Sequence, residues 1–147
     1  MKKIYLVFLI LCPIILLSNH VIEGADWKRY GGTADTSCYY DSTSISHPSK
    51  ITVRVWNKWV VNNKDGIKRR VEERVQINQS TKGYNNFKQS LMLVEIKCPT
   101  RELCVLSVAD YDNREKVLDA YKYKECQWGQ ILPDSLIENL YKAVCPH

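Results

Sequence analysis

The chain has 147 residues, and 21 Lys and Arg against 16 Asp and Glu give a net charge of +5, with 45% hydrophobic and 25% charged residues. This composition is typical of one small globular domain and excludes a disordered, collagen-like or coiled-coil chain. The length excludes large cofactor enzymes such as TIM barrels, and the positive charge is too small for a dedicated nucleic-acid binder.

The N-terminal segment has the pattern of a secretory signal peptide. A lysine pair precedes an apolar run over residues 4–17, and a short polar stretch follows the run. The run is shorter than the ~20 residues that a membrane-spanning helix needs, and Pro13 interrupts it. We therefore expect residues 1–25 to be cleaved, residues 26–147 to form the domain, and no membrane span to remain after cleavage. The expected location is the periplasm, the outer-membrane surface or the extracellular medium.

Hydrophobic alternation predicts an antiparallel sheet. Its strongest strand covers residues 86–98, where alternation places Met92, Val94, Ile96 and Cys98 on one face. Two later strands form a β-hairpin about the turn residues 112–115. Besides 86–98, the predicted strands are residues 37–40, 51–56, 103–111 and 117–123.

A charged surface helix is predicted over residues 65–79. Ile67, Val71 and Val75 recur every fourth residue there, with Lys, Arg and Glu between them. This spacing gives the helix a narrow apolar stripe and a broad charged surface.

An amphipathic helix is predicted at the C-terminus. Ser135 and Glu138 form a capping box, and apolar residues recur at helical spacing from there to Cys145. The apolar stripe of this helix needs a sheet to cover. The predicted fold class is therefore α+β, with an antiparallel sheet of five to six strands, a C-terminal helix on it and one charged surface helix.

Export places the cysteines beyond the apolar run in a compartment where disulfides persist. Cys98 and Cys145 both lie on apolar faces, and a bond between them would tether the C-terminal helix to the sheet. The hairpin brings Cys104 near Cys126, which makes that pair the most economical second bond. Cys38 then stays unpaired, although a shift of one residue in strand register would change which thiols meet.

The sequence offers little catalytic chemistry. His47 lies in a segment rich in Ser that is typical of an exposed loop, and the only later histidine is the last residue. Asp110, Asp112 and Asp134 have simpler roles in the hydrogen bonding of turns and helix caps, with a small carboxylate hydrolase as the enzymatic alternative. No CxxC pair is present, so we expect no metal and no cofactor.

Aromatic and basic side chains supply the candidate partner-binding residues. Trp56 and Trp59 bracket two polar residues and are of the type that anchors protein interfaces. A basic group on the predicted surface helix could meet an acidic polysaccharide or protein, although Glu72 and Glu73 also fit a solvated helix face. The basic candidates are Lys68, Arg69, Arg70 and Arg74.

Several short motifs resemble those of the bacterial surface-adhesin protein E family. The resemblance extends over nearly all of the predicted domain. The motifs are Trp27, Tyr40-Asp41, Val53-Arg54-Val55-Trp56, Glu95-Ile96-Lys97-Cys98, Tyr111, Trp128, Pro133-Asp134-Ser135 and Val144-Cys145.

The resemblance implies a six-stranded antiparallel sheet whose C-terminal helix is tethered by a disulfide, in agreement with a Cys98–Cys145 bond. It also implies an outer-membrane-associated, dimer-forming adhesin that binds host matrix proteins. This sequence departs from that pattern in two ways. It has no convincing lipoprotein signal, and Cys38, Cys104 and Cys126 exceed the one bond that the family needs.

The predicted function is that of an exported, non-enzymatic, adhesin-like binding protein. Its expected partner is an extracellular-matrix or envelope protein or an acidic polysaccharide, and not nucleic acid. The alternative is an envelope inhibitor or assembly factor, for example one that resembles a lysozyme inhibitor.

Overall fold

The computed structural model describes residues 24–145, so nearly all of the expected signal peptide lies outside the described residues. The described chain forms one antiparallel sheet and two α-helices, with two short 3₁₀ turns. The strands are β1 (Trp27–Gly32), β2 (Thr36–Asp41), β3 (Ser46–Ser49), β4 (Thr52–Val61), β5 (Phe87–Lys97), β6 (Glu102–Asp112), β7 (Val117–Lys122) and β8 (Gly129–Gln130). The helices are α1 (Lys64–Gln76) and α2 (Leu136–Val144).

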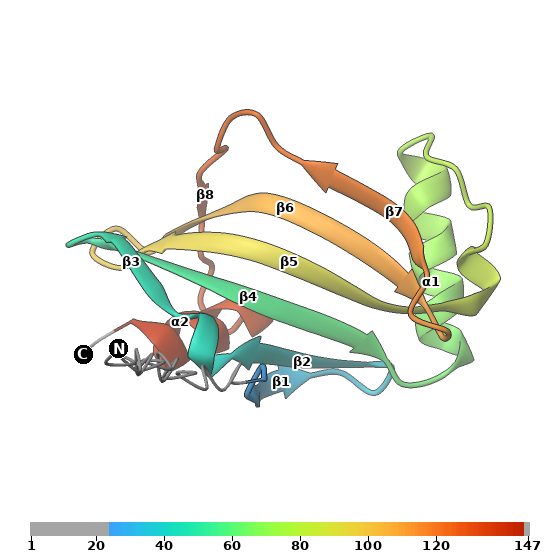
Figure 1. The fold of residues 1–147 in the computed structure, drawn as a ribbon, viewed down its shortest axis with the longest axis horizontal. Coiled ribbons are helices and arrows are strands. Elements are labelled where there is room, and N and C mark those ends of the chain that lie inside the picture. Colours follow the sequence, from blue (N-terminus) through green and yellow to red (C-terminus); the bar gives the residue numbers. More distant parts are fainter. Residues whose placement is uncertain (1–23, 146–147) are drawn as a thin grey trace, which may run out of the picture.

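Six strands follow one another across the sheet in the order β1-β2-β4-β5-β6-β7 (Figure 1). Two short strands lie beside this path, because β3 pairs with β4 and β8 pairs with β6. The predicted α+β class, the antiparallel sheet and the C-terminal helix are confirmed. The predicted hairpin is also present, as β6 and β7.

Strand β4 is longer than the predicted strand 51–56. It continues to Val61 because its second half is paired on both sides, with Trp59 opposite Cys38 of β2 and Ser90 of β5. The segment around His47, expected as a loop, forms the short exposed strand β3. Pro48 is tolerated there because β3 pairs with one neighbour only.

Both helices pack against the same face of the sheet, which we call the helix face. Val53, Val55 and Val61 share this face because side chains two apart in a strand point the same way. Val53 and Val55 pack in a core cluster with α2, and Val61 packs in a second cluster with α1. Figure 1 shows α1 at one end of the strands and α2 toward the other.

Helix α1 differs from its prediction in the side chains that it buries. Asn63 caps its N-terminus by accepting from two backbone amides, and Ile67 and Val71 contact the second cluster as the apolar stripe requires. The third predicted apolar position, Val75, is instead 60% exposed. The adjacent Arg74 is 4% exposed, so a charged side chain occupies the interior at the last turn of the helix.

Two disulfides cross-link the domain. Cys98 is bonded to Cys145, which ties the end of α2 to the end of β5. Cys104 is bonded to Cys126, which ties the chain beyond β7 back to β6. Among the described residues, Cys38 forms no disulfide, and it is fully buried in β2. Both bonds join cysteines that the sequence analysis pairs.

Neither helix of the described residues has the length and apolar character of a membrane span.

Candidate functional site

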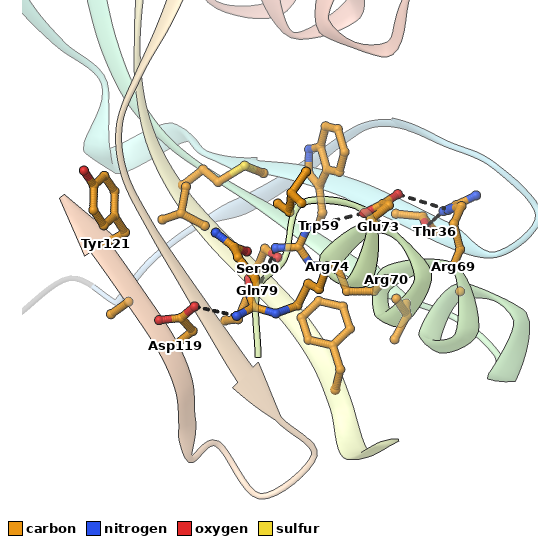
Figure 2. A pocket seen from close by; sticks show the side chains of 18 of the residues that line it. Thr36, Trp59, Arg69, Arg70, Glu73, Arg74, Gln79, Ser90, Asp119 and Tyr121 are labelled. Carbon is orange, nitrogen blue, oxygen red and sulfur yellow. Dashed lines mark hydrogen bonds and ion pairs between the residues drawn. The ribbon is translucent and has the colours of Figure 1, made fainter. Parts of the chain in front are cut away.

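A cavity of about 520 Å³ lies between α1 and the helix face of the sheet. This volume is within the range of small-molecule binding sites. Figure 2 shows arginine side chains that reach from α1 toward the strands, with Asp119 and Tyr121 on β7 across from them. We call this space the helix-side cavity. The labelled lining residues are Thr36, Trp59, Arg69, Arg70, Glu73, Arg74, Gln79, Ser90, Asp119 and Tyr121.

The strand register gives the cavity floor two parallel rows of side chains. Ser90, Asp110 and Asp119 lie opposite one another across β5, β6 and β7 and form a polar row. One step along the same face, Met92, Val108 and Tyr121 form an apolar row. A ligand in the cavity therefore meets hydrogen-bonding groups along one edge and apolar groups along the other.

Asp110 is the centre of a buried polar cluster. Its side chain is 2% exposed. Its Oδ2 accepts hydrogen bonds from Arg70 Nη2 at 2.8 Å and from Tyr84 Oη at 2.7 Å, and its Oδ1 accepts one from Ser90 Oγ at 2.5 Å. Arg74 Nη1 lies 3.7 Å from the same Oδ2. These donors and cations compensate the cost of burying the carboxylate.

The environment of Asp110 also keeps its neighbours in their donating forms. Burial and the hydrogen bond to the Asp110 carboxylate raise the pKa of Tyr84, so its hydroxyl stays protonated. Burial lowers the pKa of Arg70, but the hydrogen bond and the charge of Asp110 outweigh that effect and raise it overall. The cluster thus links α1, the segment after it, β5 and β6.

The basic candidates on α1 are ion-paired. Arg69 binds Asp35 and lies near Glu73, while Arg70 binds Asp110 and Glu73. Arg74 donates to Asp119 at 2.7 Å, and exposed Lys68 lies 3.9 Å from Glu72. The helix therefore presents a charge-balanced network and not a basic patch.

The two candidate tryptophans lie on opposite faces of β4, because they are three positions apart in a strand whose side chains alternate between its two faces. Trp59 faces the helix side, lines the cavity and donates its indole N–H to Tyr30 Oη at 2.7 Å. Trp56 is 36% exposed on the other face. The structure therefore brings Trp59, Arg69, Arg70 and Arg74 together at the cavity and leaves Trp56 and Lys68 apart from it.

Within residues 24–145, neither helix covers the face that carries Trp56, which we call the open face. Trp56 pairs with Leu93 and Lys58 pairs with Leu91, so Trp56 and the two leucines adjoin across β4 and β5, with Lys58 on one side of Trp56 and the Arg54–Glu95 ion pair on the other. Leu91 in turn pairs with Ala109 of β6. Lys58 Nζ lies 3.9 Å from the ring centroid of Trp27, a cation–π contact that holds this indole at the edge of the face.

The carboxylates considered for catalysis have structural partners. Asp112 accepts from the backbone amides of Arg114 and Lys116 in the hairpin turn, as the sequence predicts. Glu138 accepts from the backbone of Asp134 and pairs with Arg101 and Lys142 around the start of α2. Asp110 differs from its prediction, because its partners come from distant parts of the chain and not from the turn.

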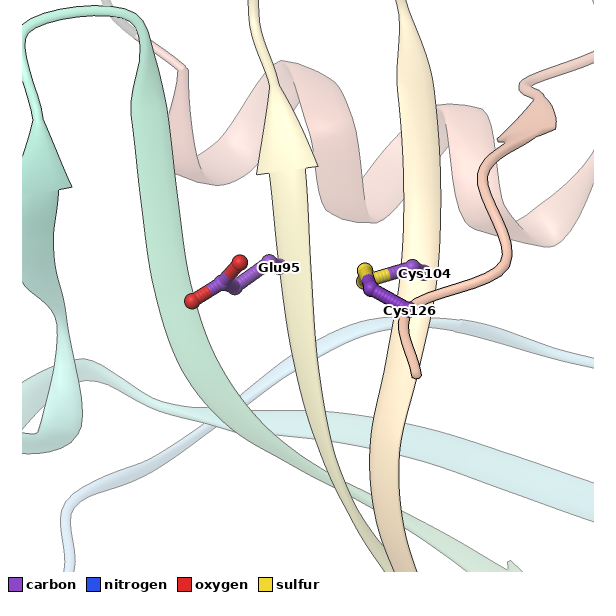
Figure 3. Close-up of side chains that lie close together, drawn as sticks. All are labelled: Glu95, Cys104 and Cys126. Atoms are coloured by element: carbon purple, nitrogen blue, oxygen red, sulfur yellow. A yellow bond between two sulfur atoms is a disulfide. The ribbon is translucent and has the colours of Figure 1, made fainter. Parts of the chain in front are cut away.

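Glu95 and the Cys104–Cys126 disulfide form a compact group whose ligand atoms lie within 4.8 Å of one another. Figure 3 shows the Glu95 carboxylate directed toward β4, with the bonded sulfurs on its other side. Arg54 Nε donates to Glu95 Oε1 at 2.9 Å. The sulfurs are bonded to each other and the carboxylate is paired with a cation, so these residues offer a metal ion neither a thiolate nor an unpaired carboxylate.

Two tyrosines at the end of β7 form an aromatic rim of the cavity that is not among the predicted site residues. Tyr121 and Tyr123 are 60% and 45% exposed, and their rings meet edge to face with centroids 4.7 Å apart. Alternation in the predicted strand 117–123 places both tyrosines on one face. That they border a cavity depends on α1, which the sequence pattern does not position.

The surface-adhesin protein E family model matches residues 27–146, and the chain belongs to this family. A solved structure that the chain resembles is crystal form II of Haemophilus influenzae protein E, at 15% sequence identity and a TM-score of 0.43. The similarity covers 74% of this chain and 79% of that chain. Among curated proteins, no sequence matches the chain.

Proposed function

We propose that this protein is an exported, non-enzymatic binding protein of the adhesin type, and that it engages a protein partner through its open face. The observation that carries the proposal is the position of Trp56, which lies exposed beside Leu93 on a sheet face without a helix over it within the described residues. Exposed tryptophan on an apolar patch is the usual composition of an interface centre. Membership of the adhesin family supports the same function.

A protein is a better partner than an acidic polysaccharide. Binding of a polyanion needs cations that are free to pair with it, whereas Arg69, Arg70 and Arg74 each already bind a carboxylate. A polyanion would have to displace those carboxylates, and Asp110 is buried. The open face offers instead apolar and aromatic surface, which a protein partner can cover.

A non-enzymatic role fits the chemistry of the described residues. The carboxylates Asp110, Asp112 and Glu138 all hold the fold together through named hydrogen bonds. Removal of a catalytic residue abolishes activity without loss of fold, whereas removal of any of these is expected to affect stability first.

Export remains part of the proposal and has its own test. The expected signal peptide should be absent from protein recovered outside the cytoplasm, and intact-mass measurement should place the new N-terminus near residue 25. Recovery of the full-length chain in the cytoplasmic fraction alone would contradict export.

Binding is tested with purified protein and immobilised extracellular-matrix extract. Trp56→Ala should lower retention by about tenfold or more, because truncation of an anchoring tryptophan costs about 2 kcal/mol or more. Leu132→Ala is the matched control, since Leu132 is 66% exposed and lies outside the open face. Equal retention of Trp56→Ala and wild-type protein would refute the role of this face.

The same preparation distinguishes the alternatives. Inhibition of a muramidase by wild-type protein, with no retention on matrix extract, would assign the chain to the envelope inhibitors. A homodimer that Trp56→Ala dissociates in sedimentation would make a second copy the occupant of the open face.

A further inference from the structure

We propose that the helix-side cavity is a second binding site, separate from the open face, and that its ligand is a neutral saccharide with an amide carbonyl, such as an N-acetylated amino sugar. The cavity lies on the opposite side of the sheet from Trp56, so this site does not depend on the protein-binding proposal. Three features of the cavity support it: its charge balance, an unmet hydrogen-bond donor and its aromatic rim.

The charged groups that line the cavity favour an uncharged ligand. Three arginines and three carboxylates line it, and they pair with one another. An anionic ligand would face Asp110 and Asp119, and a cationic one would face Arg70 and Arg74. A neutral ligand avoids both repulsions and can still accept from the arginines and donate to the carboxylates.

Arg70 has N–H groups that no acceptor of the described residues takes. Among buried side-chain N and O atoms of the described residues, Arg70 Nε and Asn57 Oδ1 lack a hydrogen-bond partner. Arg70 lines the cavity with a side chain that is 27% exposed, and Nη2 binds Asp110 and Nη1 binds Glu73 through one N–H each, so each of these nitrogens keeps a second N–H. Nε itself is covered by protein atoms, so a ligand carbonyl in the cavity would accept from a second N–H of Nη1 or Nη2.

The rest of the floor and the rim fit the other groups of an N-acetylated sugar. Met92 and Val108 form the apolar row beside the polar row of Ser90 and Asp110, which places an apolar surface next to hydrogen-bonding groups. Such a surface can contact an acetamido methyl group while Arg70 binds the adjacent carbonyl. At the rim, Tyr121 presents an exposed ring whose apolar face and polar hydroxyl match a sugar ring with C–H and O–H groups.

The test is ligand binding to wild-type protein, followed by NMR or calorimetry, with three probes of similar length. These are the N-acetylglucosamine tetramer, its deacetylated and cationic form, and an anionic oligouronate. We expect only the neutral tetramer to bind. Tyr121→Ala should lower its affinity about tenfold, and this substitution is safe for the fold because Tyr121 is 60% exposed.

Two further variants locate the ligand. Arg70→Lys keeps a positive charge opposite Asp110 but replaces the two Nη nitrogens with a single ammonium group. It should therefore lower the affinity for the neutral tetramer, and it should change the affinity for a cello-oligosaccharide, which has no amides, by less. Trp56→Ala on the open face should leave saccharide binding unchanged, which separates failure of this proposal from failure of the protein-binding one. The proposal is overturned if the neutral tetramer does not bind, if the charged probes bind equally well, if Tyr121→Ala binds like wild type, or if only extended peptides occupy the cavity.

Discussion

Glu138 holds the start of α2 to the turn between β5 and β6. Its Oε2 accepts from the Asp134 backbone at 2.9 Å, and its carboxylate pairs with Arg101 and with Lys142. The hydrogen bond from Arg101, followed by those from the Asp134 backbone and Lys142, lowers the pKa of Glu138 from 4.5 to about 2. One side chain therefore acts both as a helix cap and as a link between α2 and the sheet.

The lowered pKa predicts how stability depends on pH. Because the folded state holds its carboxylate deprotonated more strongly than the unfolded state, Glu138 contributes its full stabilisation above pH 4.5 and loses it as the pH falls toward 2. Glu138→Gln should lower the melting temperature at pH 7, and the difference from wild type should shrink between pH 4.5 and 2. Thermal denaturation at a series of pH values measures this, and a constant difference down to pH 2 would contradict it.

At the scale of the elements, the two disulfides and one glycine determine how the helices sit on the sheet. The Cys98–Cys145 bond closes a sequence separation of 47 residues, and the Cys104–Cys126 bond one of 22. The chain-entropy relation gives about 4 kcal/mol for the first loop and about 3 kcal/mol for the second. Only the first bond attaches a helix, so its loss releases α2 as well as a loop.

Cys145→Ser should therefore lower the melting temperature strongly, on the order of 15 °C for a loss of about 4 kcal/mol in a domain of this size. Cys38→Ser is the comparison, because Cys38 is buried but forms no disulfide among the described residues. Its effect should be smaller, since no loop is opened. Equal shifts for the two variants would show that the tether contributes little.

Gly66 determines how closely α1 approaches the sheet. It is buried in the first turn of α1, and a Cβ at this position would lie 2.6 Å from the backbone oxygen of Asp35. Alanine normally stabilises a helix by up to about 1 kcal/mol relative to glycine, but here the clash with backbone outweighs that gain. Gly66→Ala should lower the free energy of unfolding in urea by about 1–3 kcal/mol. Lys68→Ala, on the exposed side of the helix, should change it by less than about 0.5 kcal/mol.

At the scale of the whole molecule, the arginines of α1 contribute little to the net charge of +5 at the surface, because they pair with carboxylates. The two faces of the sheet also differ in chemistry. The open face carries Trp56, Leu91 and Leu93 between Lys58 and the Arg54–Glu95 pair, whereas the helix face carries a cavity lined by paired charges. The two proposed sites lie on opposite faces of the sheet, so ligands at these sites would not compete.

This charge distribution predicts weak retention on a sulfated polysaccharide column. Wild-type protein should elute at or below about 0.15 M salt, where exposed charges are screened beyond about 8 Å. Glu73→Gln removes a partner of Arg69 and Arg70 and should elute later. Strong retention of wild-type protein at several times that ionic strength, with no further change on Glu73→Gln, would show that free basic groups dominate the surface.

Much of the fold could be predicted because the signals are local. Alternation identifies β5, the turn 112–115 identifies the β6–β7 hairpin, and the capping box identifies α2. The sequence does not predict strand β8, because its two residues are too few to show an alternation of apolar and polar side chains. The second half of β4 was missed because its pairing with β2, and not its own pattern, extends it.

The candidate site was less predictable. The sequence identifies a basic group on a helix, namely Lys68, Arg69, Arg70 and Arg74. The direction in which each side chain points depends, however, on the rotation of α1 about its own axis when it packs on the sheet. Burial of Arg74 is favourable only because Asp110 and Asp119 face it from β6 and β7. No pattern within the helix contains that information.

The sequence by itself determined most of the long antiparallel strands, the C-terminal helix and the candidate cysteine pairs, because periodicity, capping and turn chemistry act between residues close along the chain. Only the tertiary structure decided that Trp56 and Trp59 belong to different surfaces and that the arginines of α1 neutralise buried carboxylates around a cavity. Those outcomes depend on contacts between residues that are distant in sequence, such as Arg70 and Asp110, which are 40 positions apart. Such contacts form, and stabilise the structure, only once the helix has packed on the sheet.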